Sequence, residues 1–199
     1  MPMSNSASQT RYGDVAVTLH WLIAAGVIAN IALGLYFADL PHSDPNKFTL
    51  TQTHKSIGLT VLLLSLLRVG WRLVHPVPPL PADMGPLMRI AARTTHFMLY
   101  VLIVAIPLSG WALVSASPLG LPTMYFGLFP WPQLPFLADL PRAMKRLWAH
   151  QFGAIHVFLA WSMIVLASIH ILAALYHQFV RRDEVLGRML PLVSGAKKA

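Results

Sequence analysis

The sequence contains no cysteine and few charged residues of either sign. Its 199 residues include seven acidic and fifteen basic side chains, so that only 11% of the chain is charged. The lack of cysteine excludes disulfides, iron–sulfur clusters and thiolate chemistry. A water-soluble domain normally carries about 25% charged residues. Together with 56% hydrophobic residues and a mean hydropathy of +0.59, this scarcity of charge points to a membrane protein.

Long stretches without Asp, Glu, Lys or Arg locate the membrane-spanning segments. A spanning helix needs about 20 apolar residues. Three of the four stretches are long enough, and the shorter one (56–67) is flanked by Lys55, Arg68 and Arg72, whose side chains can reach the interface. We therefore predict an all-α fold, an integral membrane four-helix bundle, with spans at about 15–38, 52–74, 91–115 and 148–179.

The remaining segments connect or flank these spans. We expect residues 11–191 to form one transmembrane domain, with a flexible N-terminal tail at 1–10 and a C-terminal tail at 192–199. Residues 1–10 lack the basic start and apolar core of a cleavable signal peptide. Prolines throughout the connection 116–147 exclude a spanning helix there. Its aromatic residues predict a position on the outer surface, either as a lid or as a loop without a specific task.

Basic residues predict the orientation of the bundle. An even number of spans puts both termini on one side of the membrane. That side carries ten basic residues, Arg11, Arg68, Arg72, Arg89, Arg93, Arg181, Arg182, Arg188, Lys197 and Lys198. The other side carries five, Lys47, Lys55, Arg142, Lys145 and Arg146. The positive-inside rule therefore places both termini in the cytoplasm, and the net charge of +8 suits anionic lipid rather than nucleic acid.

The nine histidines are the unexpected residues in so apolar a chain. His42 and His75 lie in loops beside prolines, where solvated side chains are ordinary. Seven others lie in or near the spans, namely His20, His54, His96, His150, His156, His170 and His177. Because ionisable groups inside a membrane are costly, this number favours a functional role.

Helical geometry sorts these histidines into two groups. His156 and His170 are 14 residues apart, close to four full turns, so they share one face of the last span. Their separation along the axis is about 21 Å, too far for one metal ion and suitable for two separate centres. His177 falls on the same face.

Depth along the spans then suggests the partners. His20 and His170 both lie about 15 Å past the cytoplasmic charge boundary. On the outer side His54 pairs with His156, with His150 as the alternative.

Two imidazole pairs at opposite leaflets, with no cysteine, are what two haem b groups need. Haem is flat, largely apolar and bound between helices through iron–histidine bonds. Small residues would leave room for the rings, and four glycines in the spans are candidates, with ordinary close helix packing as the alternative: Gly26, Gly34, Gly58 and Gly110.

Several motifs resemble a known family. They are LHW at 19–21, THKSIG at 53–58, RVGWR at 68–72, THFMLY at 95–100 and IHVFLAWSMIVLASIH with LYHQF and RDEVLGRMLP after it. Over about residues 11–191 the chain resembles the bacterial cytochromes b561, di-haem proteins of the inner membrane. The resemblance implies axial ligation of one haem by His20 and His170 and of the other by His54 and His156. It also implies electron transfer involving the quinone pool, with oxidation of superoxide at the outer face and reduction of ubiquinone.

Two further sets of residues are candidates for sites near the haems. His96, His177 and Arg93 are shallower than the ligands on the inner side, which suits a quinone site or a proton relay, or else hydrogen bonds to haem propionates. On the outer side a positive funnel for a small anion is formed by Lys47, Lys55, Arg142, Lys145, Arg146 and His150. The alternative is that these charges contact propionates and lipid phosphates.

Two other functions fit the same composition. Similar four-helix cytochromes anchor a hydrogenase or dehydrogenase subunit and pass its electrons to the quinone pool, in which case the connection 116–147 would be the docking surface. A metal or proton transporter without haem would need acidic residues inside its spans. Because Asp14 lies at an end and the span interiors have almost no others, this function is disfavoured.

Overall fold

Four long helices make up most of the protein in the computed structural model, which describes residues 11–81 and 84–190. They are α1 (Asp14–Asp39), α2 (Lys47–Val74), α3 (Pro86–Ser115) and α5 (Arg142–Tyr176). Each is long and apolar enough to cross a membrane. The predicted all-α four-helix membrane architecture is confirmed. The tails expected at 1–10 and 192–199 lie outside the described residues.

Three helices begin earlier than the spans predicted from charge. α2 starts five residues before the expected span, and α3 and α5 start at Pro86 and just after Pro141. Proline is favoured at the start of a helix because its missing N–H would have no partner there. The apolar run marks only the part of each helix that must avoid water, and the backbone remains helical beyond it.

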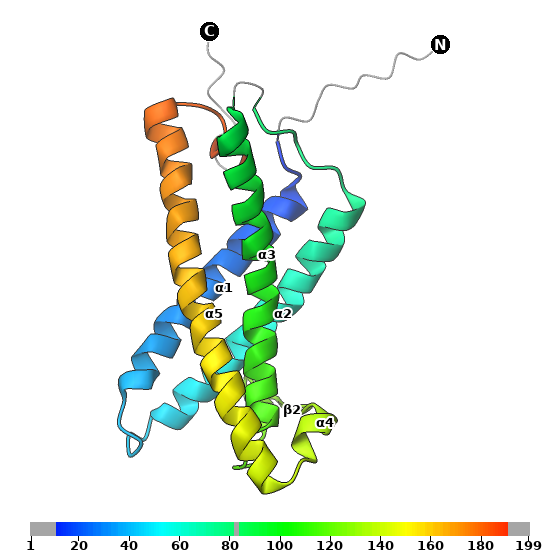
Figure 1. The fold of residues 1–199 in the computed structure, drawn as a ribbon, viewed down its shortest axis with the longest axis vertical. Coiled ribbons are helices and arrows are strands. Elements are labelled where there is room, and N and C mark those ends of the chain that lie inside the picture. Colours follow the sequence, from blue (N-terminus) through cyan, green and yellow to red (C-terminus); the bar gives the residue numbers. More distant parts are fainter. Residues whose placement is uncertain (1–10, 82–83, 191–199) are drawn as a thin grey trace.

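The bundle consists of two helical pairs. α1 packs on α2, α3 packs on α5, and α2 joins the pairs by packing on α3. Figure 1 shows the two pairs crossing obliquely, with the start of α1 and the end of α5 at the same end of the bundle. Many large apolar side chains on the helices point outward, including Leu67, Phe158 and Leu172. Hydrocarbon rather than water is the environment that accepts such a surface.

Two of the glycines allow α1 and α2 to approach closely. A Cβ on Gly26 would lie 2.8 Å from Cγ2 of Val61, and one on Gly58 would lie 3.4 Å from Nδ2 of Asn30. These contacts are helix packing, the alternative considered for glycines in the spans.

The connection between α3 and α5 folds back onto α2. It contains a short antiparallel hairpin, β1 (Thr123–Tyr125) with β2 (Phe129–Trp131), and the helical turn α4 (Pro135–Ala138). The buried Ser56 fixes this hairpin, because its Oγ accepts a hydrogen bond from Phe126 N at 2.9 Å. Phe126 has a left-handed backbone with φ of 49°, which costs a non-glycine residue about 1–2 kcal/mol. The anchored hairpin therefore covers the end of the bundle at which α2 begins.

Residues 183–190 close the opposite end of the bundle. α5 continues into a π-helical turn, η1 (His177–Arg181), and the chain then reverses at Arg182, whose φ is 53°. After the single turn η2 (Gly187–Met189), the chain is tied to α1 by the Trp21 Nε1 hydrogen bond to Met189 O at 2.7 Å. Arg188 donates to Pro79 O at 2.7 Å, which ties the same segment to the connection between α2 and α3.

Candidate functional site

The histidine pair predicted for the outer side, referred to below as the outer pair, faces across the bundle from α2 to α5. The ring centres of His54 and His156 are 6.1 Å apart and their planes are inclined by 79°. His54 Nδ1 is 3.1 Å from the carbonyl oxygen of Asn30, and His156 Nδ1 is 3.0 Å from that of Ile106. A carbonyl oxygen can only accept a hydrogen bond, so each Nδ1 must carry the proton. Both rings therefore present an unprotonated Nε2, the atom that can bind a metal.

Two glycines provide the space in which these rings sit. A Cβ on Gly34 would lie 3.1 Å from Cε1 of His54. A Cβ on Gly110 would lie 3.1 Å from Cε1 and 3.3 Å from Nδ1 of His156. Each histidine thus packs directly on the backbone of the facing helix, α1 or α3. Gly34 and Gly110 therefore make room for the rings of His54 and His156, in addition to allowing the helices to pack closely.

The inner pair has the same arrangement but a third histidine beside it. The ring centres of His20 on α1 and His170 on α5 are 6.4 Å apart, with planes inclined by 71°. His96 on α3 lies closer to His170, at 5.2 Å between ring centres. Its Nδ1 bonds the carbonyl oxygen of Ala92 in its own helix. The structure therefore brings three imidazoles together at this end of the bundle.

The spacing within each pair tests whether a metal fits between the rings. Two imidazoles bound on opposite sides of one metal ion, each through a bond of about 2 Å, have ring centres about 6.3 Å apart. The His54–His156 and His20–His170 distances match this value, whereas the His96–His170 distance is too short. An all-imidazole donor set suits iron in haem, and both pairs fit such a group.

The two pairs are separate sites on one helix. His156 and His170 lie four turns apart on α5, which corresponds to about 21 Å. Met163 lies midway between them and, at 2% exposure, is one of the most buried side chains in the bundle. A buried apolar side chain thus lies between the two pairs along α5.

The other predicted inner residues do not gather at one place. His177 is buried, and its Nδ1 donates to Asp183 Oδ2 at 2.6 Å. Although burial opposes the charge of Asp183, the hydrogen bonds from His177 and Val185 and the charge of Arg181 hold the pKa of that carboxyl below its usual value. Arg93 is exposed on α3. Of this predicted set, only His96 contacts a member of the inner pair.

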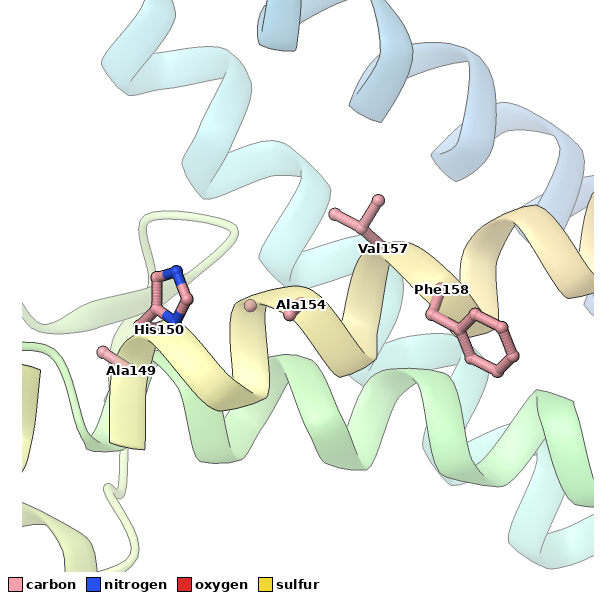
Figure 2. Close-up of a pocket in the computed structure, with 6 residues that line it drawn as sticks. Ala149, His150, Ala154, Val157 and Phe158 are labelled. Carbon is pink, nitrogen blue, oxygen red and sulfur yellow. The ribbon is translucent and has the colours of Figure 1, made fainter. Parts of the chain in front are cut away.

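The predicted cationic residues lie near the outer ends of α2 and α5. Lys47 starts α2 and donates to Leu40 O at 2.6 Å, and Lys55 lies half-buried beside His54. At the start of α5, Arg142, Arg146 and His150 are exposed and Lys145 is half-buried. Figure 2 shows His150 pointing away from α3, on the face of α5 that carries Ala154 and Val157. The structure therefore places His156, and not His150, opposite His54.

Several residues of the sites could not be found from the sequence. Ser109 Oγ lies 3.0 Å from His156 Nδ1, and the backbone of Asn30 holds His54. Arg68 and Arg72 both lie over the ring of Tyr100, at 5.6 Å, beside a cavity of about 110 Å³ at the inner end. The only available signal was the presence of polar residues inside apolar spans, and this signal does not show which residues their side chains contact.

Comparison with known proteins identifies the family of this chain. The family model for prokaryotic cytochrome b561 matches residues 11–192. Cytochrome b561 homolog 2 of Escherichia coli (strain K12) is 39% identical over 191 residues, covering 94% of this chain and 95% of that protein. The probable superoxide oxidase CybB of Yersinia pestis is 27% identical over 189 residues, covering 93% and 98%. Cytochrome b562 of Cereibacter sphaeroides is 27% identical over 184 residues, covering 90% and 94%.

The resemblance expected from the motifs is therefore confirmed over nearly the whole chain. The match includes all four helices and both histidine pairs. The chain belongs to the prokaryotic cytochrome b561 family of haem b-binding membrane proteins that transfer electrons.

Proposed function

We propose that this protein carries electrons across the bacterial inner membrane through two haem b groups, from superoxide at the outer face to ubiquinone. His54 and His156 hold the outer haem, and His20 and His170 hold the inner one. The observation that carries this proposal is the presence of two facing imidazole pairs, each with the spacing expected for two histidines that hold one metal ion, four turns apart along α5. The distribution of basic residues supports an orientation with both termini in the cytoplasm.

The chain itself positions the reaction rather than supplying its redox centre. Haem b provides one-electron chemistry when bound. His54 and His156 are oriented by the carbonyl oxygens of Asn30 and Ile106, and the buried core around Met163 excludes water between the sites. With both imidazoles of a pair holding the haem, substrates would exchange electrons at the edge of the site. Two superoxide anions leave as dioxygen, and one ubiquinone takes up the two electrons with two protons.

Superoxide as the donor is supported by the name of one relative and by the charges at the outer end. The Yersinia pestis relative is described as a probable superoxide oxidase. Near the outer pair this chain has five basic residues, Lys47, Lys55, Arg142, Lys145 and Arg146. Such a field raises the local concentration of a small anion and speeds its encounter with the site.

Stopped-flow mixing of the purified, detergent-solubilised protein with superoxide and a soluble ubiquinone tests this proposal. We expect rapid haem reduction by superoxide, followed by reoxidation by the quinone. Raising ionic strength from about 0.01 M to 0.15 M shortens the Debye length from about 30 to 8 Å, so the reduction rate should fall steeply. Replacing Arg142 and Arg146 together by Gln should lower the rate and its salt dependence, with Arg89→Gln at the inner end as the control. Haem reduction no faster than superoxide dismutation would rule superoxide out.

On the inner side we infer that His96 and His177 supply protons to the quinone. His177 donates a hydrogen bond to Asp183. It lies in the π-helical turn that follows α5, at the edge of the bundle and away from the ligand candidates. Replacing His177 with Ala should slow reoxidation by quinone several-fold while both haem spectra remain unchanged. Asp183→Asn keeps the His177 ring but changes its hydrogen-bond partner, so it should slow reoxidation by quinone to a smaller extent. Loss of a haem in either variant would show a structural role instead.

A role as the membrane anchor of a partner redox subunit is the second candidate. The connection between α3 and α5 exposes Leu119, Leu128 and Phe136 at the outer end, each at least 70% exposed. Such residues suit either a partner subunit or the lipid interface. A partner that co-purifies in stoichiometric amount from native membranes would favour the anchor function.

A further inference from the structure

The two histidine pairs differ in the hydrogen bonds of their Nδ1 atoms. In the outer pair His54 donates to Asn30 O, and His156 donates to both Ile106 O and Ser109 Oγ. Ser109 Oγ itself donates to Ile106 O at 2.7 Å, which leaves its lone pairs for the histidine. Among the described residues, neither His20 nor His170 has a hydrogen-bond partner; their contacts are with the neighbouring rings of Trp21, His96 and each other.

A hydrogen bond from Nδ1 changes the electronic character of a metal-bound imidazole. As the proton is shared with an acceptor, the ring becomes more basic and donates more electron density through Nε2. A stronger donor stabilises ferric over ferrous iron and so lowers the reduction potential of the site. The outer pair has three acceptors, so its iron should be the harder of the two to reduce.

Nearby cationic side chains reinforce the same difference. Arg68 acts electrostatically on His20, and both Arg68 and Arg72 act on His96. Within residues 11–81 and 84–190, no carboxylate pairs with either guanidinium. Of the five basic residues near the outer pair, Lys55 acts on His54 as the smallest of its influences, and His156 has no cationic side chain among its influences. Positive charge in a poorly screened site favours the form of the iron that has gained an electron. The two guanidiniums should therefore raise the potential of the inner site.

We propose that the outer site has the lower reduction potential, so that electrons run downhill from the outer to the inner face, and that Ser109 is a positioning residue that sets this difference through His156. This inference rests on the proposed function, because it requires the four histidines to bind haem. It goes beyond that function by giving the order of the two reduction potentials and assigning it to identified contacts.

An equilibrium redox titration of the purified protein, followed by visible absorption, tests the order of the potentials. His20→Ala, which is expected to lack the inner haem, identifies the bands of the outer one. The expected result is two reduction steps, with the outer haem reduced at the lower potential. An outer haem that is reduced first, or together with the inner haem, would overturn the proposal. This measurement needs only the wild-type protein and one reference variant.

Ser109→Ala tests the role of the serine. A single hydrogen bond contributes about 0.5–1.5 kcal/mol, so its loss should raise the reduced-to-oxidised ratio of the outer haem at fixed ambient potential by roughly three- to tenfold. The inner haem is the internal reference and should not shift. Ser109→Thr keeps an oxygen at the same position and should remain close to wild type. An unchanged outer potential in Ser109→Ala, with both haems bound, would refute the role of Ser109.

The failure of this inference can be told apart from failure of the proposed function. A protein that binds no haem, or keeps both haems when His54 or His156 is replaced, contradicts the ligand assignment itself. A protein with two low-spin haems whose potentials are equal or reversed contradicts only the proposed order of the potentials.

Discussion

Replacing His156 with alanine is expected to yield a protein that binds one haem b per chain instead of two, with the spectrum of the inner haem preserved. His54→Ala should give the same result, because either change removes one of the two imidazoles proposed to hold the outer haem. Replacing His20 or His170 should instead remove the inner haem. The measurement is the haem-to-protein ratio of the purified variants, together with reduced-minus-oxidised difference spectra.

Two neighbouring histidines serve as matched controls for these variants. His150 lies six residues before His156 on α5 but is exposed, so His150→Ala should keep both haems. His96 lies 5.2 Å from His170, and His96→Ala should also keep both haems, because that spacing is too short for opposite sides of one metal. If His96→Ala lost the inner haem and His20→Ala kept it, the inner ligand pair would be His96 with His170.

The second large effect is expected at Gly110. A Cβ at this position would come 3.1 Å from Cε1 of His156, so Gly110→Val should displace the ring and abolish the outer haem. Metal sites tolerate errors of only about 0.5 Å in the position of a ligand. Gly110→Ala should weaken binding of the outer haem more mildly, even though alanine favours the helix over glycine by about 1 kcal/mol. Haem loss without loss of helix stability would therefore identify a steric effect on the site.

A glycine in open space supplies the control. Apart from the backbone of its own helix turn, nothing lies within 4 Å of the Cβ position of Gly70 on α2, so Gly70→Ala should keep both haems without lowering the thermal unfolding midpoint. Gly34→Ala should repeat the effect of Gly110→Ala on the same haem, because Gly34 packs against His54. Circular dichroism measures the helix content and unfolding, and visible absorption measures the haem. Full occupancy of both sites in Gly110→Val would contradict the packing argument.

The four helices and the placement of two histidines on one face of α5 were predictable from the sequence. Hydrocarbon accepts only backbone whose hydrogen bonds are made within the segment, so an apolar run of sufficient length has to be helical. The period of the helix then fixes that residues 14 apart, such as His156 and His170, lie on one face. The sequence left several imidazoles at each end of the bundle, and depth and the family resemblance favoured His156 as the partner of His54, with His150 as the alternative.

The tertiary structure places His156 opposite His54 and provides the groups that hold the two rings. The groups that support each outer histidine come from the neighbouring helix and not from its own. Helix α1 contributes the Asn30 carbonyl and the space at Gly34 to His54, and α3 contributes the Ser109 hydroxyl and the space at Gly110 to His156. The link from His177 to Asp183 likewise depends on the chain reversal at Arg182. The period and hydropathy of a segment are local properties of the chain. The crossing angles and rotations of packed helices depend on many weak contacts between distant residues, and they determine which side chains meet.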